Sequence, residues 1–216
     1  MPFINMDHAA GTPLLPEVYE TMTPYFMQEF GNPSSLHPGG TRPREALEES
    51  RAQIAALLGA NPQEIVFTSC GSEANNQAVK GAAWAHERKG RHIVVSAIEH
   101  QSVINAAKAL TRLGWEVTTV GVDSRGFVNP DDIASAMRTD TTLVSVMHAN
   151  NEIGTIEPIK EIAERVKEKG ALFHTDAVQT AGTIPVNVDQ LGVDFLTLSA
   201  NEIGRASCRE RVYHPV

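Results

Sequence analysis

Short apolar stretches rich in β-branched residues alternate with amphipathic stretches along most of the chain. Several of the short stretches are almost continuously apolar, which is typical of strands that are covered on both faces of a sheet. Six strands are predicted, at Glu64–Cys70, His92–Ile98, Glu116–Val122, Thr142–Ala149, Leu172–Ala177 and Phe195–Ala200. Helices are predicted between them, at Pro43–Leu58, Glu73–Glu87, Ser102–Leu113 and Ile159–Glu168. This alternation predicts an α/β fold with a mainly parallel, doubly wound sheet and helices on both faces.

Residues 1–40 differ in composition from the rest of the chain. They contain several prolines and the turn-rich loop GNPSSLHPGG at Gly31–Gly40. Such a composition favours an extended arm around one helix near Pro16–Glu29. The sequence therefore predicts an N-terminal arm and loop over residues 1–40, followed over residues 41–201 by one domain without an inner boundary.

Composition and charge narrow the classes of function. Hydrophobic residues make up 42% of the 216 residues and charged residues 20%, as in packed globular proteins. A formal net charge of -8 without a basic stripe argues against nucleic-acid binding. No apolar run approaches the roughly 20 residues of a membrane span, and the first residues do not resemble a signal peptide. Two cysteines, Cys70 and Cys208, cannot form a disulfide scaffold, so a cytoplasmic protein is expected.

Polar residues follow the first predicted strand at the edge where open α/β sheets bind their ligands. Gly71 permits a close backbone approach there, and Ser72 can cap the helix that follows. The free N–H groups of such a helix start form an anion site that suits a phosphate. An ordinary helix cap explains the same residues. The sequence contains neither G-x-G-x-x-G nor G-K-[ST], so dinucleotide and P-loop sites lack their fingerprints.

Three further strand ends carry candidate ligand-binding residues. His100 follows the second strand, where a histidine can stack on a ligand ring or move protons near neutral pH, although a lone histidine is also common on a surface. Asn150 and Asn151 follow the fourth strand and can donate to a ligand or build a turn. Asp176 ends the fifth strand, where an unpaired buried carboxylate is costly and should face a cation or a donor.

Ser199 follows the sixth strand and is a further candidate phosphate ligand. A phosphate cradle, an aromatic stacker, an amide and a buried acid at neighbouring strand ends fit a phosphorylated heteroaromatic cofactor. Pyridoxal 5'-phosphate (PLP) fits best, because its ring nitrogen needs an acid to stay protonated. No metal site is expected, because the histidines show no paired ligand spacing.

Six segments occur in an order that resembles a known family. They are Met6–Pro13, Gly31–His37, Phe67–Glu73, Glu99–His100, Asn150–Gly154 and His174–Gln179. In these segments the chain resembles the cysteine desulfurases of the NifS/IscS type, relatives of the class V aminotransferases with the PLP fold type I architecture. The resemblance implies removal of sulfur from L-cysteine to give L-alanine and an enzyme persulfide. It also implies a sulfur acceptor or Fe–S scaffold protein as partner, and a homodimer of the full-length protein.

The resemblance also implies residue roles. It assigns the cofactor phosphate to Gly71, Ser72 and Ser199, and the cofactor ring and its substituents to Asn151, Asp176 and Gln179. Asp176 would pair with the ring nitrogen, and Gln179 would contact the phenolic oxygen. His100 would stack on the ring and take part in proton transfer, which makes it the expected catalytic residue.

The chain departs from the family after Ala200. Family members continue with His-Lys, and that lysine forms the Schiff base with the cofactor, whereas this sequence has Asn201 and Glu202. Glutamate cannot form an imine. Cys208 lies too early to be the persulfide cysteine, and Cys70 is expected to be a small packing residue. Residues 41–201 are therefore expected to form a partial large PLP-binding domain.

The run EIGRASCRERV at Glu202–Val212 equals the translation of a common short-read sequencing adapter. We therefore expect an N-terminal fragment without turnover, with a non-native tail at 202–216 that arises from adapter read-through. A genuine inactive paralogue is the competing explanation. The alternative functions are a selenocysteine lyase or another class V relative, and a non-enzymatic PLP-fold pseudoenzyme. The sequence beyond Ala200 would separate the two enzymes, and stable folding of the 216-residue chain alone would favour the pseudoenzyme.

Overall fold

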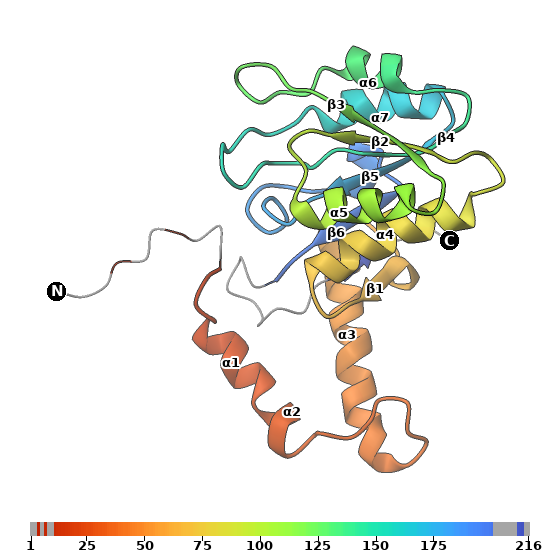
Figure 1. The fold of residues 1–216 in the computed structure, drawn as a ribbon. Coiled ribbons are helices and arrows are strands. Elements are labelled where there is room, and N and C mark those ends of the chain that lie inside the picture. Colours follow the sequence, from red (N-terminus) through yellow and green to blue (C-terminus); the bar gives the residue numbers. More distant parts are fainter. Residues whose placement is uncertain (1–3, 5–6, 8–10, 201–210, 214–216) are drawn as a thin grey trace.

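One seven-stranded sheet forms the centre of the computed structural model, which describes residues 4, 7, 11–200 and 211–213 (Figure 1). Its strands are β1 (Ile65–Phe67), β2 (His92–Ser96), β3 (Glu116–Val120), β4 (Thr141–Ser145), β5 (Leu172–Asp176), β6 (Phe195–Leu198) and β7 (Arg211–Tyr213). Their order is β1-β7-β6-β5-β4-β2-β3. The five strands from β6 to β3 pair in parallel, and β7 is antiparallel to β1 and β6. The predicted mainly parallel α/β sheet is confirmed.

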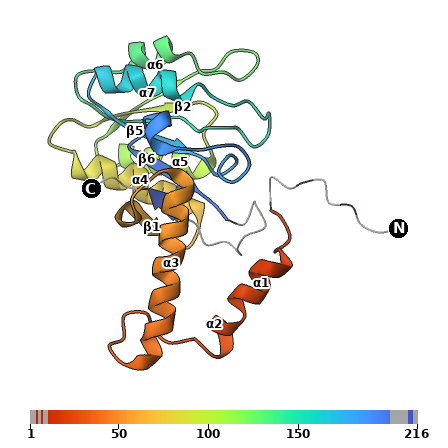
Figure 2. The same ribbon diagram turned by 180° about the vertical axis from the view of Figure 1, so that it is seen from behind.

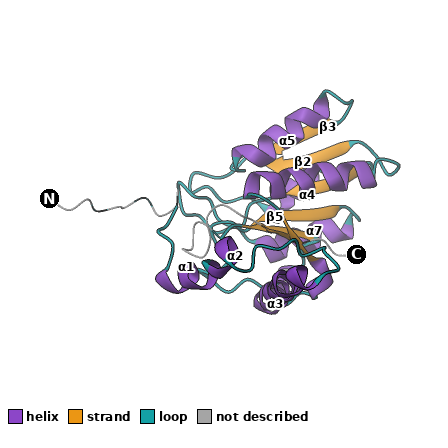
Figure 3. Ribbon diagram, turned by 90° about the horizontal axis from the view of Figure 1, so that it is seen from below, coloured by secondary structure: helices purple, strands orange, loops and turns teal. Residues whose placement is uncertain are grey.

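Side chains that alternate along the strands form one core on each face of the sheet. On β2, Ile93 packs against α4 (Gly71–Ala85) and α5 (Gln101–Thr111), whereas Val94 packs in the opposite core. The opposite core is covered by α3 (Thr41–Leu58), α6 (Pro130–Ala136), α7 (Ile159–Glu168) and α8 (Val188–Leu191). These layers can be followed in Figure 3. The predicted doubly wound arrangement, with helices on both faces, is therefore present.

The helix predictions succeed where the amphipathic pattern is long. α7 has the predicted bounds, because Ile159, Ile162 and Val166 recur at helical spacing and are buried. α3 ends at Gly59, whose φ of 70° suits a glycine C-cap. The short helices α6 and α8 were not predicted. Among the described residues, no helix combines the length and apolar character needed to cross a membrane.

The N-terminal region contains two short helices where one was predicted. They are α1 (Pro16–Met22) and α2 (Pro24–Met27), and a 3-10 turn follows at Pro38–Gly40. Pro24 has no N–H, so it cannot continue the hydrogen-bond ladder of α1. Neither helix contains a buried residue, and both lie beside α3 and apart from the sheet (Figures 1 and 2).

The tail expected to be non-native lies mostly outside the described residues. Residues 201–210, which include Asn201, Glu202 and Cys208, and residues 214–216 are among those not described. The exception is β7, which was not predicted and pairs with β1 and β6. A strand at this place does not test the origin of the tail, which stays a prediction.

Candidate functional site

Asp176 is a buried acid at the carboxyl end of a central strand. It is the last residue of β5 and is 3% exposed. Its Oδ1 accepts a hydrogen bond from the Val178 N–H at 3.0 Å, and its Oδ2 accepts one from Asn75 Nδ2 at 2.7 Å. Burial raises the pKa of Asp176, while these two hydrogen bonds and a charge on His100 lower it. The carboxylate therefore has donors, and a bound cation would stabilise its charged form further.

A chain of hydrogen bonds connects Asp176 to His100. Asn75 on α4 also donates to Ser102 Oγ at 2.9 Å, and Ser102 Oγ lies 2.7 Å from His100 Nδ1. His100 is the exposed N-cap of α5, and its Nδ1 accepts the Ser102 backbone N–H at 3.2 Å. Asp176 and His100, the two ends of this connection, were predicted from the sequence, whereas Asn75 and Ser102 were not. The signal that could have found Asn75 and Ser102 was their polar side chains at positions on the otherwise apolar faces of α4 and α5.

The N-terminus of α4 lies where the sequence predicts an anion site. Gly71 is buried at the first helical position, and Ser72 is exposed at the second. The N-cap residue, Cys70, makes no side-chain capping hydrogen bond. Glu73 instead bonds Ser69 through its Oε2, 2.6 Å from Ser69 Oγ, which lowers the pKa of Glu73. The first N–H groups of a helix have no partner within that helix, so this terminus suits an anion.

Glu99 forms a second polar centre, at the carboxyl ends of β2 and β4. It is 5% exposed and accepts from Ser96 Oγ at 2.6 Å, Met147 N at 2.7 Å and Ser145 Oγ at 3.0 Å. These bonds tie the end of β2 to β4. Burial, together with the nearby charge of Asp176, raises the pKa of Glu99 to about 7 despite the three hydrogen bonds. The carboxyl group of Glu99 is therefore partly protonated at neutral pH.

His174 extends this centre across the sheet. Its Nδ1 lies 2.9 Å from Ser145 Oγ, and its Nε2 lies 3.0 Å from Thr197 Oγ1 on β6. Complete burial lowers the pKa of His174 to about 3, so the ring is neutral in the folded protein. His174 belongs to one of the six segments that resemble the family, and no role was predicted for it. Serine, histidine and threonine at inward positions of apolar strands were the signal that could have revealed this connection.

The remaining predicted residues also lie at the carboxyl edge of the sheet. Asn151 is exposed in the turn after β4, Gln179 is half-buried shortly after Asp176, and Ser199 is buried just beyond β6. In the turn after β4, Asn150 donates to the Ile98 carbonyl and accepts from the backbone N–H of Glu152. The roles of Asn151, Gln179 and Ser199 towards a cofactor stay predictions.

The site fits the cofactor that the sequence suggested. A buried carboxylate that a cation would stabilise and an open helix N-terminus match the ring nitrogen and the phosphate of PLP. The described residues contain no group of three or more histidine, cysteine, aspartate or glutamate side chains that could hold a metal ion.

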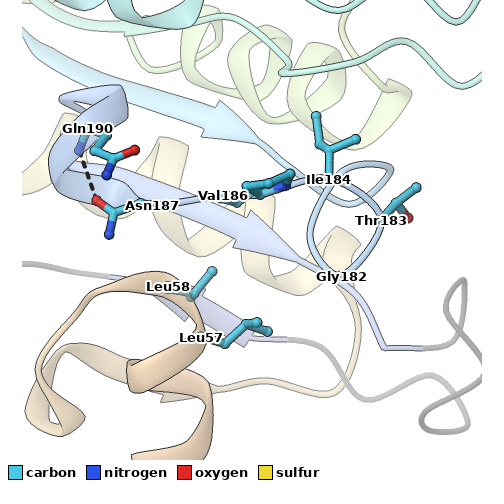
Figure 4. A pocket seen from close by; sticks show the side chains of 9 residues that line it. Leu57, Leu58, Gly182, Thr183, Ile184, Val186, Asn187 and Gln190 are labelled. Atoms are coloured by element: carbon cyan, nitrogen blue, oxygen red, sulfur yellow. Dashed lines mark hydrogen bonds between the residues drawn. The ribbon is translucent and has the colours of Figure 1, made fainter.

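The structure also contains a cavity of about 450 Å³ (Figure 4). The end of α3, the segment before α8 and α8 itself form its walls, which include Leu57, Leu58, Ile184, Val186, Asn187 and Gln190. None of the residues predicted to bind the cofactor lines it.

Comparisons with known proteins give a consistent result. The family described as aminotransferase class-V matches residues 4–203. A curated relative named cysteine desulfurase IscS, from Dictyoglomus turgidum, is 54% identical over 199 residues, which are 92% of this chain and 50% of that protein. The solved structure described as SspA in complex with cysteine superposes with a TM-score of 0.94 at 36% identity, covering 98% of this chain and 61% of that one.

A second solved structure, described as a NifS-like protein, has a TM-score of 0.93 at 38% identity and covers 96% of this chain and 57% of that one. This chain therefore spans about half the length of the curated relatives that it matches.

Proposed function

The chain belongs to the aminotransferase class-V family, and from this premise we propose that it is part of a PLP-dependent cysteine desulfurase of the NifS/IscS type. The enzyme removes sulfur from L-cysteine, yields L-alanine and carries the sulfur as an enzyme persulfide. The observation that carries the proposal is the buried carboxylate of Asp176, which is hydrogen-bonded and connected through Asn75 and Ser102 to His100.

Different residues of this chain bind different parts of the cofactor. PLP, when bound, supplies a protonated aromatic ring that accepts electrons from the substrate. Asp176 keeps the proton on the ring nitrogen, because an ionised carboxylate stabilises the positive charge beside it. The N-terminus of α4 binds the phosphate through the backbone at Gly71 and Ser72, with Ser199 as a further ligand.

Other residues hold the ring and the substrate in place. His100 stacks on the ring and moves a proton at its exposed side. Asn151 and Gln179 contact the ring substituents. A structure described as a complex with cysteine, which resembles this chain over 98% of its length, supports L-cysteine as the substrate. A sulfur acceptor or Fe–S scaffold protein, a homodimer and a cytoplasmic location complete the proposal.

The test uses the protein expressed from the complete native open reading frame, called the complete protein below. We expect it to bind PLP and absorb visible light, to change its spectrum on addition of L-cysteine, and to release sulfide in the presence of a reductant. A protein that binds no PLP, or that releases no sulfide although it binds PLP, would overturn the proposal. The native frame also shows whether Asn201 and Glu202 are genuine.

A second assay addresses the alternative enzyme. Equal concentrations of L-cysteine and L-selenocysteine are compared by the rate of alanine formation, which both substrates yield. A rate with L-selenocysteine that exceeds the rate with L-cysteine by orders of magnitude would favour the lyase. Comparable rates favour the desulfurase.

A further inference from the structure

Asn75 joins the two halves of the proposed cofactor site. It is 1% exposed, and its amide nitrogen donates both hydrogens, one to Asp176 Oδ2 and one to Ser102 Oγ. Its Oδ1 is buried and has no hydrogen-bond partner among the described residues. Leaving a buried acceptor without a donor destabilises the folded protein. The orientation of this amide is therefore set by what its nitrogen binds.

Asp176 determines which way the amide faces. With Asp176 ionised, both carboxylate oxygens are acceptors, and a reversed amide would place Oδ1 against the lone pairs of Oδ2. Oδ1 could accept a hydrogen bond from Asp176 only if the acid were protonated. The unpaired Oδ1 is thus the consequence of an amide that keeps its nitrogen on an ionised Asp176.

The direction of donation continues to His100. Ser102 Oγ accepts from Asn75, so its single hydrogen is available for His100 Nδ1, 2.7 Å away. The backbone N–H of Ser102 donates to the same Nδ1 at 3.2 Å, and a backbone N–H cannot reverse its role. Both donors favour a lone pair on Nδ1, and the hydroxyl is the closer of the two. In the neutral ring the hydrogen then lies on Nε2.

We propose that Asn75 and Ser102 are positioning residues, which hold His100 in the Nε2–H tautomer and Asp176 in an ionised state that faces the cofactor ring. The part about the cofactor rests on the function proposed above, whereas the part about the tautomer does not. Because Nδ1 is occupied by two donors, Nε2 is the ring nitrogen through which His100 exchanges protons with a ligand. An asparagine that only tied α4 to β5 would not determine the tautomer of a histidine on α5.

The tautomer is measured directly by nuclear magnetic resonance. The complete protein is labelled with ¹⁵N-histidine, and long-range ¹H–¹⁵N correlations are recorded with and without PLP at a pH where the ring is neutral. The His100 signals are assigned by their loss in His100→Gln. We expect the Nε2–H pattern in both samples. The Nδ1–H pattern would overturn the proposal, even if no variant of Asn75 or Ser102 were to fold.

Variants separate positioning from structural support. Ser102→Ala and Asn75→Ala should each lower the ratio of Nε2–H to Nδ1–H tautomers at least fivefold, because each removes a donor or frees the Ser102 hydroxyl to accept from Nδ1–H. Ser102→Thr retains the hydroxyl and should restore the ratio. The neighbouring variants Gln101→Ala and Asn76→Ala serve as controls and should leave it unchanged. An unchanged ratio in both Ser102→Ala and Asn75→Ala would overturn the proposal.

Binding of PLP tests the other end of the connection. Asn75→Ala should weaken PLP binding on the order of tenfold, because Asp176 loses a hydrogen bond to its charged form, and the exposed α4 variant Gln77→Ala should not. Equal affinities in Asn75→Ala and Gln77→Ala would overturn the role of Asn75 towards Asp176. If the complete protein binds no PLP but shows the expected tautomer shifts, the proposed function fails while the positioning of His100 stands.

Discussion

Glu99 and His174 share one hydroxyl group, because Ser145 Oγ lies 3.0 Å from Glu99 Oε2 and 2.9 Å from His174 Nδ1. The hydroxyl has one hydrogen, so it donates to only one of them at a time. With Glu99 ionised, Ser145 donates to it and accepts from His174 Nδ1–H. With Glu99 protonated on Oε2, the direction reverses and the ring hydrogen moves to Nε2, towards Thr197. Both arrangements satisfy every member of this buried chain.

The two groups act in opposite directions on the pH dependence of folding. The pKa of Glu99 is raised to about 7, so the folded protein binds more protons than the unfolded chain between pH 4.5 and 7, and stability falls as pH rises there. The pKa of His174 is lowered to about 3, so the folded protein binds fewer protons between pH 3 and 6.5, and stability rises with pH there. The two slopes oppose each other between pH 4.5 and 6.5.

Replacing Glu99 by glutamine should remove its contribution to the pH dependence of stability and leave that of His174. Glutamine keeps the shape and can still accept from Met147 N, but it has no charge to bury. Relative to the parent, Glu99→Gln should therefore gain roughly 3 kcal/mol of unfolding free energy as pH rises from 4.5 to 7, measured by urea unfolding of the PLP-free complete protein. The exposed carboxylate variant Glu164→Gln is the control. Parallel pH profiles for Glu99→Gln and the parent would contradict the prediction.

The charge of Asp176 should destabilise the PLP-free folded protein and strengthen the binding of PLP. Burial raises its pKa, so above that pKa the ionised form destabilises the folded protein when no cation is bound. Asp176→Asn should raise the melting temperature of the PLP-free protein at pH 8 and weaken PLP binding at least tenfold. Absorbance titration and thermal unfolding of the complete protein measure the two effects. The exposed variant Asp189→Asn should change neither. A lowered melting temperature without PLP would assign Asp176 a structural role instead.

The sequence predicted the strands well, because their apolar runs are nearly continuous. Each of the strands from β1 to β6 lies within or one residue beyond its predicted range. The pattern did not reveal the break between α1 and α2, since both sides of Pro24 are compatible with a helix. Short helices such as α6 and α8 contain too few turns for a periodicity to stand out.

The same contrast holds for the site. The positions of Asp176 and His100 after their strands could be predicted from the sequence, whereas their roles towards a ligand stay predictions. The contact between Asn75 and Asp176 could not be predicted, because the two residues are 101 positions apart in the chain. The partner of Asn75 depends on how α4 packs over β5, which no local pattern specifies. In the sequence Glu99 stood out only as the neighbour of His100. Its burial depends on tertiary packing, which the sequence pattern does not specify.

The adjacent amides Asn150 and Asn151 should have separate roles. Asn150 donates to the Ile98 carbonyl at 3.0 Å and its Oδ1 accepts the N–H groups of Glu152 and Ile153, so Asn150→Ala should cost roughly 1–3 kcal/mol of stability. Asn151 is exposed, so Asn151→Ala should leave the melting temperature unchanged and weaken PLP binding. Each variant is the control for the other in thermal unfolding and PLP titration. A loss of stability in Asn151→Ala, with none in Asn150→Ala, would reverse the assignment.

Gly59 and Gly154 have nearly the same backbone conformation but different surroundings. Their φ angles are 70° and 72°, so a side chain at either position costs roughly 1 kcal/mol of left-handed strain. A Cβ at Gly154 would meet nothing within 4 Å, whereas a Cβ at Gly59 would overlap the amide of Asn187. Asn187 accepts the Gln190 N–H at 3.0 Å and thereby caps α8 beside the cavity shown in Figure 4.

The overlap at Gly59 cannot be relieved without moving that cap, and loss of a cap typically costs about 1 kcal/mol. Gly59→Ala should therefore lower the unfolding free energy by about 2 kcal/mol or more, and Gly154→Ala by about 1 kcal/mol. Urea unfolding of the two variants beside the parent measures the difference. Equal losses would mean that Asn187 swings aside freely, and that the wall of the cavity between α3 and α8 yields to a methyl group. A larger loss at Gly59 would identify this contact as a rigid junction between the end of α3 and the start of α8.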